Sequence, residues 1–342
     1  MKKLYVVVAV LVLAAMLLPA CTATAPDCTQ ADVFCVGMVT DVGKIDDKSF
    51  NQSAWEGVQQ AKTDGVADWV QYIETTDAKD YAKNIATFAD AGYDVIVTVG
   101  FNLTDQTRAA GEIYPNVMFI GVDQDQYAGT IDNVAGLIFP EDQAGFLVGA
   151  LAAMMSETGK IGSVCGTDAV PPVWRFGEGY RAGALYVNPD IEVFVVYHSD
   201  VGFDKTFTDP EWGAATADSM IDNGADVIFG AGGKTGNGAV TEAAQRGVYA
   251  IGVDTDQYLT LPEAAPKMLS SAMKLITPGV AELIGMAKDG TLTGGNFLGQ
   301  ASFAPYHDVA NEVPADVQAR MEEINAMILS GELTTGVPPV KP

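Results

Sequence analysis

The chain carries an internal duplication, which limits its possible folds more than any other feature of the sequence. The segment 120–127 reads IGVDQDQY, and about 130 residues later the segment 251–258 reads IGVDTDQY. A second match joins AGYDVI at 91–96 to NGADVI at 223–228. One repetition at so long a spacing excludes a solenoid, which stacks at least three short repeats. The sequence therefore predicts two lobes of one topology.

Strand-like and helix-like segments alternate through both halves of the chain. Short β-rich apolar runs predict strands at 33–40, 70–73, 94–99, 117–122, 160–165, 191–197, 226–230, 248–253 and 268–273. Amphipathic runs predict helices at 81–91, 105–114, 211–222 and 237–246, with others after 40 and after 165. This alternation is typical of parallel sheets with helices on both faces. The expected fold class is α/β, with two similar doubly wound lobes and a ligand cleft between them.

The N-terminus has the pattern of a secretory signal. Lys2 and Lys3 precede an apolar run at 4–20, which is short for a membrane-spanning helix. The run ends in Leu-Pro-Ala-Cys, which resembles a lipobox, and Cys21 is therefore the predicted lipidation site. The alternative is an uncleaved anchor helix. Both interpretations locate the protein on the extracytoplasmic face of the cell membrane.

These patterns suggest a division of the whole chain. We expect a lipoprotein signal peptide at 1–20, a flexible tether at 21–32, an N-terminal lobe at 33–158 and a C-terminal lobe at 159–295. The segment 296–342 is expected to hold a crossover, a C-terminal helix and a tail.

The remaining cysteines suggest a disulfide rather than a metal site. Cys28 and Cys35 can pair in an oxidising compartment, whereas Cys165 lies in an apolar run typical of a buried strand. The chain has no Cys-x-x-Cys pair and only two histidines, so neither a metal nor a cofactor is expected. The formal charge of −25 argues against a nucleic-acid partner and against a highly charged anionic ligand.

Polar residues follow several of the predicted strands. Asp41, Asp123 and Asp254 lie just beyond strand ends, where open α/β sheets bind ligands. If the lobes face each other, Asp123 and Asp254 approach one cleft from opposite sides. The alternative is that each aspartate caps a turn or helix. In the loop 40–52, Phe50 offers a flat face and Asn51 an edge contact, unless Ser49 is only an N-cap and Phe50 only a core residue.

Two features of the second half also bear on a binding site. The glycine run 230–238 lacks the spacing of a phosphate loop, so Gly230 is expected to approach an uncharged ligand closely. Lys274, at a strand end opposite Asp254, can donate hydrogen bonds to vicinal hydroxyls, or it is simply a solvated strand end. Calcium is not expected, because the Asp-x-Asp-Gln-Tyr loops lack the glycine and glutamate of an EF-hand.

The motifs at 39–52, 207–210 and 225–233, both Gly-Val-Asp segments and Lys274 resemble the basic membrane protein family. The family consists of bacterial lipoproteins similar to the purine nucleoside receptor. The resemblance implies a type I periplasmic-binding-protein fold. It also implies a monomer that delivers a nucleoside, with a purine favoured, to an ABC permease and its ATPase.

The resemblance also implies a role for each matching residue. Phe50 would stack on the base and Phe207 would lie opposite, although Phe203 is a nearby rival. The expected contacts to polar edges of base or sugar come from Asp41, Asn51 and Asp123, and those to the ribose from Asp254 and Lys274, with Gly230 close by.

Other functions fit the sequence less well. A nucleoside hydrolase would need an aspartate at position 39, which is valine, and no Ser-His-Asp or Cys-His set is evident, so no enzyme is expected. An adhesion lipoprotein would not need a polar cleft. A binding protein for a sugar or another polar solute would share the same fold.

Overall fold

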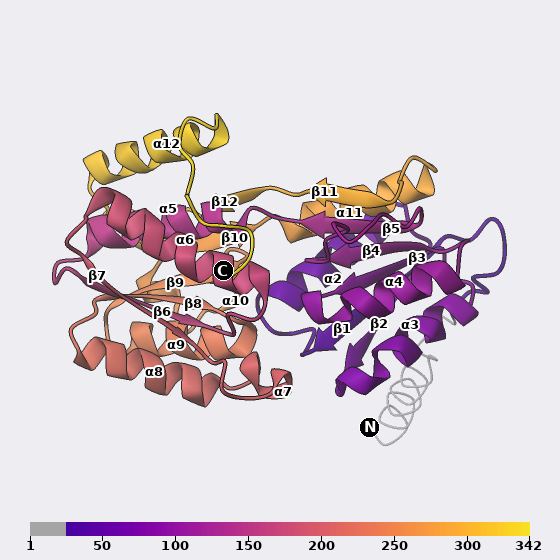
Figure 1. Cartoon of the computed structure of the whole chain (residues 1–342), viewed down its shortest axis with the longest axis horizontal. Helices are drawn as coiled ribbons and strands as arrows, with labels where there is room; N and C mark the ends of the chain where they lie inside the picture. Colours follow the sequence, from indigo (N-terminus) through magenta and orange to yellow (C-terminus); the bar gives the residue numbers. More distant parts are fainter. Residues whose placement is uncertain (1–24) are drawn as a thin grey trace, which may run out of the picture.

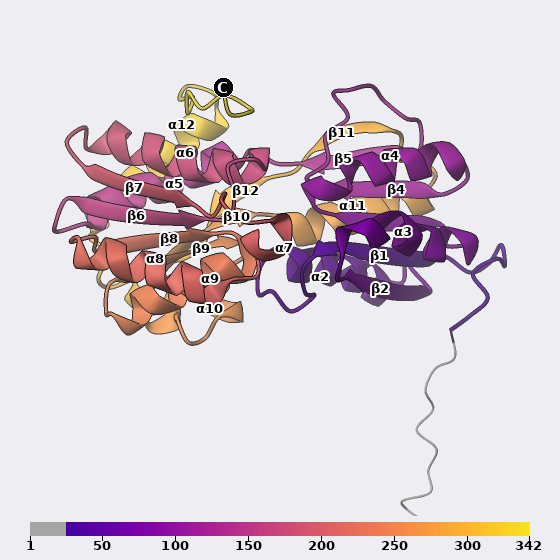
Figure 2. The same ribbon diagram turned by 60° about the horizontal axis from the view of Figure 1, so that its bottom comes forward.

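The computed structural model describes residues 25–342, so Cys21 and the expected signal peptide lie outside the described residues. The chain forms two lobes that lie side by side, each built on a six-stranded sheet with helices on both faces (Figures 1 and 2). The fold class predicted from the duplication is confirmed. None of the helices in the described part of the chain is long and apolar enough to cross a membrane.

The first sheet has the order β11-β5-β4-β3-β1-β2, and all of its strand pairs are parallel. Its strands are β1 (Cys35–Val42), β2 (Trp69–Thr75), β3 (Val95–Val99), β4 (Met118–Val122), β5 (Val134–Ile138) and β11 (Gly295–Leu298). Alternate residues along β1 face opposite cores, because side chains alternate along a strand. Val36 and Met38 pack under α2 (Phe50–Thr63) and α11 (Ile276–Lys288), whereas Cys35 and Val39 pack under α3 (Tyr81–Asp90) and α4 (Thr104–Ile113).

The second sheet repeats this order as β12-β10-β9-β8-β6-β7. Its strands are β6 (Lys160–Cys165), β7 (Glu192–Tyr197), β8 (Val227–Ala231), β9 (Tyr249–Asp254), β10 (Met268–Lys274) and β12 (Ala301–Phe303). Only β12 runs antiparallel to its neighbour. One face packs on α5 (Glu141–Met155), α6 (Pro171–Val187) and α12 (Ala315–Leu329), and the other on α8 (Pro210–Asp222) and α9 (Gly233–Gln245).

The expected lobe boundaries at 158 and 295 are wrong. The chain exchanges elements between the lobes, so that α5 packs against α6 and α12 of the second lobe. In return α11 packs against α2, and β11 pairs with β5 of the first lobe (Figure 1). The apolar faces of α5 and α11 match surfaces made by distant parts of the chain, and a linear pattern cannot reveal which lobe supplies them. Three crossing segments result, at 139–141, 274–276 and 298–301.

Glycines let α5 and α6 approach closely, which holds α6 in place beside the cleft. A Cβ atom on Gly149 would lie 2.0 Å from the Tyr180 carbonyl oxygen, and one on Gly183 would lie 1.9 Å from that of Phe146. No side chain fits in these positions, so the pair of glycines sets the spacing of the two helices.

The predicted cysteine pair is present. Cys28 and Cys35 form a disulfide that joins the segment before the first lobe to the first residue of β1. Cys165 is a free, buried thiol at the end of β6, as its apolar surroundings predicted.

Candidate ligand-binding site

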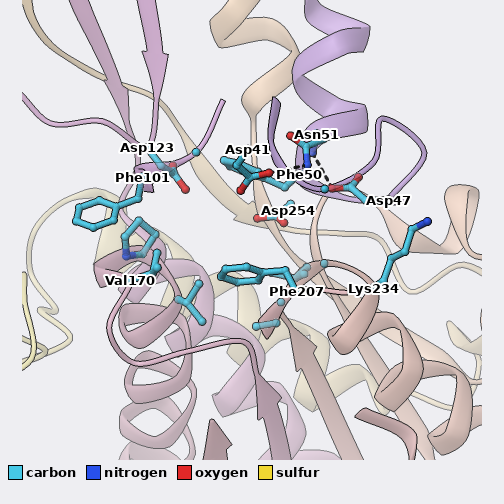
Figure 3. A pocket seen from close by; sticks show the side chains of 18 of the residues that line it. Asp41, Asp47, Phe50, Asn51, Phe101, Asp123, Val170, Phe207, Lys234 and Asp254 are labelled. Carbon is cyan, nitrogen blue, oxygen red and sulfur yellow. Dashed lines mark hydrogen bonds between the residues drawn. The ribbon is translucent and has the colours of Figure 1, made fainter. Parts of the chain in front are cut away.

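A cavity lies between the lobes, at the carboxyl ends of both sheets (Figure 3). Its empty space, counted out to the open mouth, is about 760 Å³. Seven of the eight predicted ligand residues line it: Asp41, Phe50, Asn51, Asp123, Phe207, Asp254 and Lys274. The sequence therefore predicted part of the wall, including the aspartates that follow strands, because strand ends can be recognised locally and parallel strands end at one edge.

Gly230 is the exception, because it does not line the cavity. It lies within β8, and a Cβ atom there would be 2.4 Å from the Gly236 carbonyl oxygen. The glycine is needed for α9 to pack on the strand. The next residues, Ala231, Gly232 and Gly233, line the cavity instead.

The two repeated aspartates adopt the same backbone conformation. Asp123 directly follows β4 and has a φ of 61°, and Asp254 is the last residue of β9 and has a φ of 66°. This left-handed region is uncommon for residues other than glycine, although aspartate tolerates it better than most. The shared conformation turns both carboxylates toward the cavity from opposite lobes, as the duplication predicted (Figure 3).

Lys274 is buried among carboxylates from both lobes. Its Nζ lies 2.5 Å from Asp123 Oδ2, 3.7 Å from Glu141 Oε1 and 3.9 Å from Asp254 Oδ1. Burial alone would lower the pKa of the ammonium, but these carboxylates outweigh burial and raise it. The nearest carboxylate to Lys274 is thus that of Asp123 in the first lobe, with Asp254 farther away, and Lys274 stays charged.

A second cation, Arg175 on α6, pairs with the Glu141 carboxylate of this cluster. Its guanidinium lies 2.9 Å from Glu141 Oε2, donates to the Phe139 carbonyl at 3.2 Å and also pairs with Asp142. Burial raises the pKa of Glu141 to about 7, although Lys274 pulls it down. Neither Glu141 nor Arg175 was predicted from the sequence. No local motif marks them, because they become site residues only where α5 and α6 cross.

The loop between β1 and α2 contains two polar side chains, those of Asp47 and Ser49, that make hydrogen bonds beside the cavity. Asp47 accepts hydrogen bonds from the backbone N–H groups of Ser49 at 3.0 Å, Asn51 at 2.9 Å and Gln52 at 3.1 Å, and so caps α2. Ser49 occupies the N-cap position of α2, as one reading of the sequence predicted, but its hydroxyl makes no capping bond and instead donates to Asp254 Oδ2 at 2.6 Å. Burial raises the pKa of Asp47 to about 6, despite these hydrogen bonds.

Asp41 and Asn51 form a pair on the same wall. Asn51 Nδ2 donates to Asp41 Oδ1 at 3.2 Å. Burial raises the pKa of Asp41 to about 7; the Asn51 hydrogen bond opposes this shift, and the negative charges of Asp47 and Asp123 add to it. Two buried acceptors, Asn51 Oδ1 and Asp123 Oδ1, have no hydrogen-bond partner within the described chain. Buried acceptors of this kind suit a ligand that donates hydrogen bonds.

Aromatic side chains form the other surfaces of the cavity. Phe50 and Phe207 project from opposite lobes (Figure 3), and Phe101 and Phe176, which the sequence analysis missed, also line the space. Phe203 does not line it and is 46% exposed, so the geometry selects Phe207 over its rival.

The site has no evident catalytic or metal-binding set. His198 stacks on Trp212 and His307 on Tyr258, and neither histidine lines the cavity. Among residues 25–342, no group of three or more His, Cys, Asp or Glu side chains is arranged to hold a metal ion.

Comparisons with known proteins agree with this architecture. Residues 34–299 match the family described as ABC transporter substrate-binding protein PnrA-like, a family of binding proteins rather than enzymes. A CD4+ T-cell-stimulating antigen of Listeria monocytogenes is 33% identical over 323 residues, which cover 88% of this chain and 87% of that protein. The ABC transporter nucleoside-binding protein BmpA of Lactococcus lactis is 32% identical over 281 residues, which cover 76% and 77%.

A solved structure shares the fold across both lobes. It is an ABC transporter solute-binding protein from Aeropyrum pernix K1, with a TM-score of 0.76 and 27% identity over 88% of this chain and 92% of that one. The type I periplasmic-binding-protein architecture and the ABC-transporter role expected from the resemblance are thereby established. The chain belongs to the PnrA-like family of ABC transporter substrate-binding proteins, the family that contains the basic membrane proteins.

Proposed function

We propose that the protein is a lipid-anchored, monomeric receptor that captures a nucleoside, with a purine favoured, and delivers it to an ABC permease and its ATPase. The observation that carries this proposal is the composition of one cavity. It combines flat aromatic faces from both lobes with a cluster of carboxylates around a buried ammonium. The name of the Lactococcus lactis relative, a nucleoside-binding protein, supports the same ligand class.

The aromatic part of the cavity suits a nucleobase. Phe50 and Phe207 come from opposite lobes, so a planar base held between them would contact one phenyl ring on each of its two faces. The free Asn51 Oδ1 and the neighbouring Asp41 carboxylate would accept hydrogen bonds from N–H groups at the ring edge.

The charged part of the cavity suits a ribose. Vicinal hydroxyls can donate to the carboxylates of Asp254 and Asp123 and accept from the Lys274 ammonium. A phosphorylated nucleoside would bring negative charge toward Asp41, Asp47, Asp123 and Asp254. The three lysines that line the cavity, Lys44, Lys234 and Lys274, are each already paired with a carboxylate. We therefore infer that nucleosides are bound in preference to nucleotides.

Capture would involve closure of the lobes around the ligand. A solute that contacts both lobes binds the closed state more tightly and shifts the population toward it. The three crossing segments are suited to act as hinges because each joins sheet or helix ends of the two lobes. Closure predicts that saturating inosine reduces the radius of gyration in small-angle scattering, because it removes the open fraction of the ligand-free population.

The decisive experiment is calorimetric titration with inosine, 2′-deoxyinosine, hypoxanthine and glucose. Leaving buried polar groups unsatisfied costs about 1–3 kcal/mol, so inosine should bind about ten- to a hundredfold more tightly than 2′-deoxyinosine. Asp254→Ala should remove most of this difference in affinity. Phe50→Ala should weaken the binding of both nucleosides alike, because stacking on the base does not contact the sugar hydroxyls. Tight binding of glucose and none of inosine would replace this proposal with a sugar receptor.

A further inference from the structure

One loop of the first lobe is docked into the second lobe. This clasp loop, residues 46–49, connects β1 to α2 and exposes its backbone carbonyl groups to side chains of the second lobe. Asn237 Nδ2 donates to the Asp47 carbonyl at 2.7 Å. Gln257 Nε2 and Thr260 Oγ1 both donate to the Lys48 carbonyl, at 3.1 and 2.8 Å. The second lobe thus binds the backbone of the loop, in addition to the side chains of Ser49, which donates to Asp254, and Asp46, which pairs with Lys234.

The donors form a preorganised cradle. Gln257 is fully buried, its Nε2 also donates to Asn237 Oδ1 at 2.9 Å, and its Oε1 accepts from the Val253 N–H at 3.0 Å. These bonds lie within the second lobe and orient both amide side chains before the loop arrives. The cradle therefore has little conformational freedom to lose on docking.

The clasp loop is continuous with ligand-facing groups. Lys48 has a φ of 63°, a conformation that the docked carbonyl helps to hold. On its far side Ser49 donates to Asp254 Oδ2 at 2.6 Å, and Asp47 caps the helix that begins with Phe50 and Asn51. Residues of the second lobe consequently determine where the aromatic face and amide of the first lobe sit.

We propose that Asn237 and Thr260, together with Gln257, are positioning residues that clasp the loop only when the lobes are closed. None of the three lines the cavity. They act on the ligand through the loop that carries Phe50 and Asn51, and through the population of the closed state. This inference rests on the proposed function for its ligand, but the clasp itself is a property of the protein without ligand.

Loss of hydrogen-bond donors from the cradle should shift the lobes toward the open form. In an open form, water solvates the carbonyls of Asp47 and Lys48, so opening leaves no polar group stranded. If Asn237 is removed, the closed form must instead bury the Asp47 carbonyl without a donor, and loss of Thr260 takes away one of the two donors to the Lys48 carbonyl. Both losses shift the equilibrium toward the open form. Because apparent affinity scales with the fraction of competent closed protein, ligand binding weakens without any lost ligand contact.

The test compares an Asn237→Ala/Thr260→Val variant with an Asn84→Ala/Thr87→Val control. The control removes a matching amide bond and hydroxyl bond that stay inside the first lobe, from Asn84 Nδ2 to Thr75 Oγ1 at 3.0 Å and from Thr87 Oγ1 to the Lys83 carbonyl at 2.9 Å. Small-angle scattering gives the radius of gyration without ligand, and stopped-flow titration gives inosine affinity and dissociation rate. Asn237→Ala alone serves if the double variant does not fold, because it removes the donor to the Asp47 carbonyl.

We expect the cradle variant to have a larger ligand-free radius of gyration, about three- to tenfold weaker inosine binding and faster dissociation. The control should match the wild type in all three quantities. A radius of gyration equal to that of the wild type overturns the clasp, even if the affinity falls. Since that comparison needs no ligand, it decides the clasp even where the wild type binds no nucleoside and the proposed function fails.

Discussion

The Lys274 ammonium at the end of β10 lies 2.5 Å from the Asp123 carboxylate at the end of β4, so one buried ion pair joins the two lobes at the floor of the cavity. Glu141 and Asp254 surround the same ammonium at 3.7 and 3.9 Å. Together with Arg175, which pairs with Glu141, this ammonium offsets the charge of the three carboxylates. The pair is therefore both a structural link and a source of ligand-binding groups.

Replacement of Lys274 by methionine should strongly destabilise the protein. Removing one partner of a buried ion pair leaves uncompensated charge, at a cost of about 3–5 kcal/mol. Urea denaturation measures the free energy of unfolding, with Lys79→Met as control because Lys79 pairs with Asp77 on the exposed surface. A Lys274→Met/Asp123→Asn double variant should recover part of the loss. Equal losses in Lys274→Met and the control would contradict the prediction.

Stability without ligand should fall as the pH rises from 5 to 8. Burial raises the pKa of Asp41 from 3.8 to about 7 and that of Asp47 from 3.8 to about 6, and it raises that of Glu141 from 4.5 to about 7. In this window the folded chain holds protons that the unfolded chain has released, so unfolding becomes more favourable as pH increases.

The contribution of Asp41 can be isolated by substitution. Asp41→Asn should flatten the pH dependence of the thermal unfolding midpoint relative to the wild type, because asparagine has no proton to release. Asp132→Asn, at an exposed position, is the matched control. Scanning calorimetry between pH 5 and 8 would refute this assignment if the slope of Asp41→Asn equals that of the wild type.

Phe207 and Phe203 should respond differently to truncation. Phe207→Ala removes an aromatic face of the cavity. It should weaken the binding of inosine and of 2′-deoxyinosine equally, by about tenfold or more, since the stacking contact with the base and the apolar area that it buries are lost. Phe203→Ala, at a position largely open to solvent, should leave both affinities within about twofold. Titration of both ligands against both variants decides the matter, and the reverse ranking would make Phe203 the stacking residue.

Cys21 should carry the lipid anchor of the mature protein. The residue lies outside the described part of the chain, so this prediction depends on the Leu-Pro-Ala-Cys motif alone. Mass spectrometry of the membrane fraction should find an acylated peptide that begins at Cys21, because the lipobox cysteine becomes the new N-terminus. Cys21→Ser should shift the protein to the soluble fraction, since lost acyl chains no longer bury methylenes in the bilayer. A variant that stays acylated would disprove the assignment.

Local patterns in the chain are enough to predict the two-lobed α/β fold, most strand positions and the aspartates that follow them. Alternation of apolar residues and the repeated Gly-Val-Asp motif are short-range features, and parallel strands bring their carboxyl ends to one edge by geometry. For this reason the sequence by itself assigns Asp41, Asp123 and Asp254 to a common cleft.

Only the tertiary packing determines which lobe α5 and α11 pack against and which carboxylate is nearest to Lys274. It places Gly230 against α9 rather than in the cavity wall. It also brought Glu141 to Arg175 and the carbonyl of Lys48 to Gln257. Each of these pairings joins residues far apart in sequence, and each depends on how whole helices and sheets fit together. A linear pattern records which face of an element is apolar, but it does not record which distant surface covers that face.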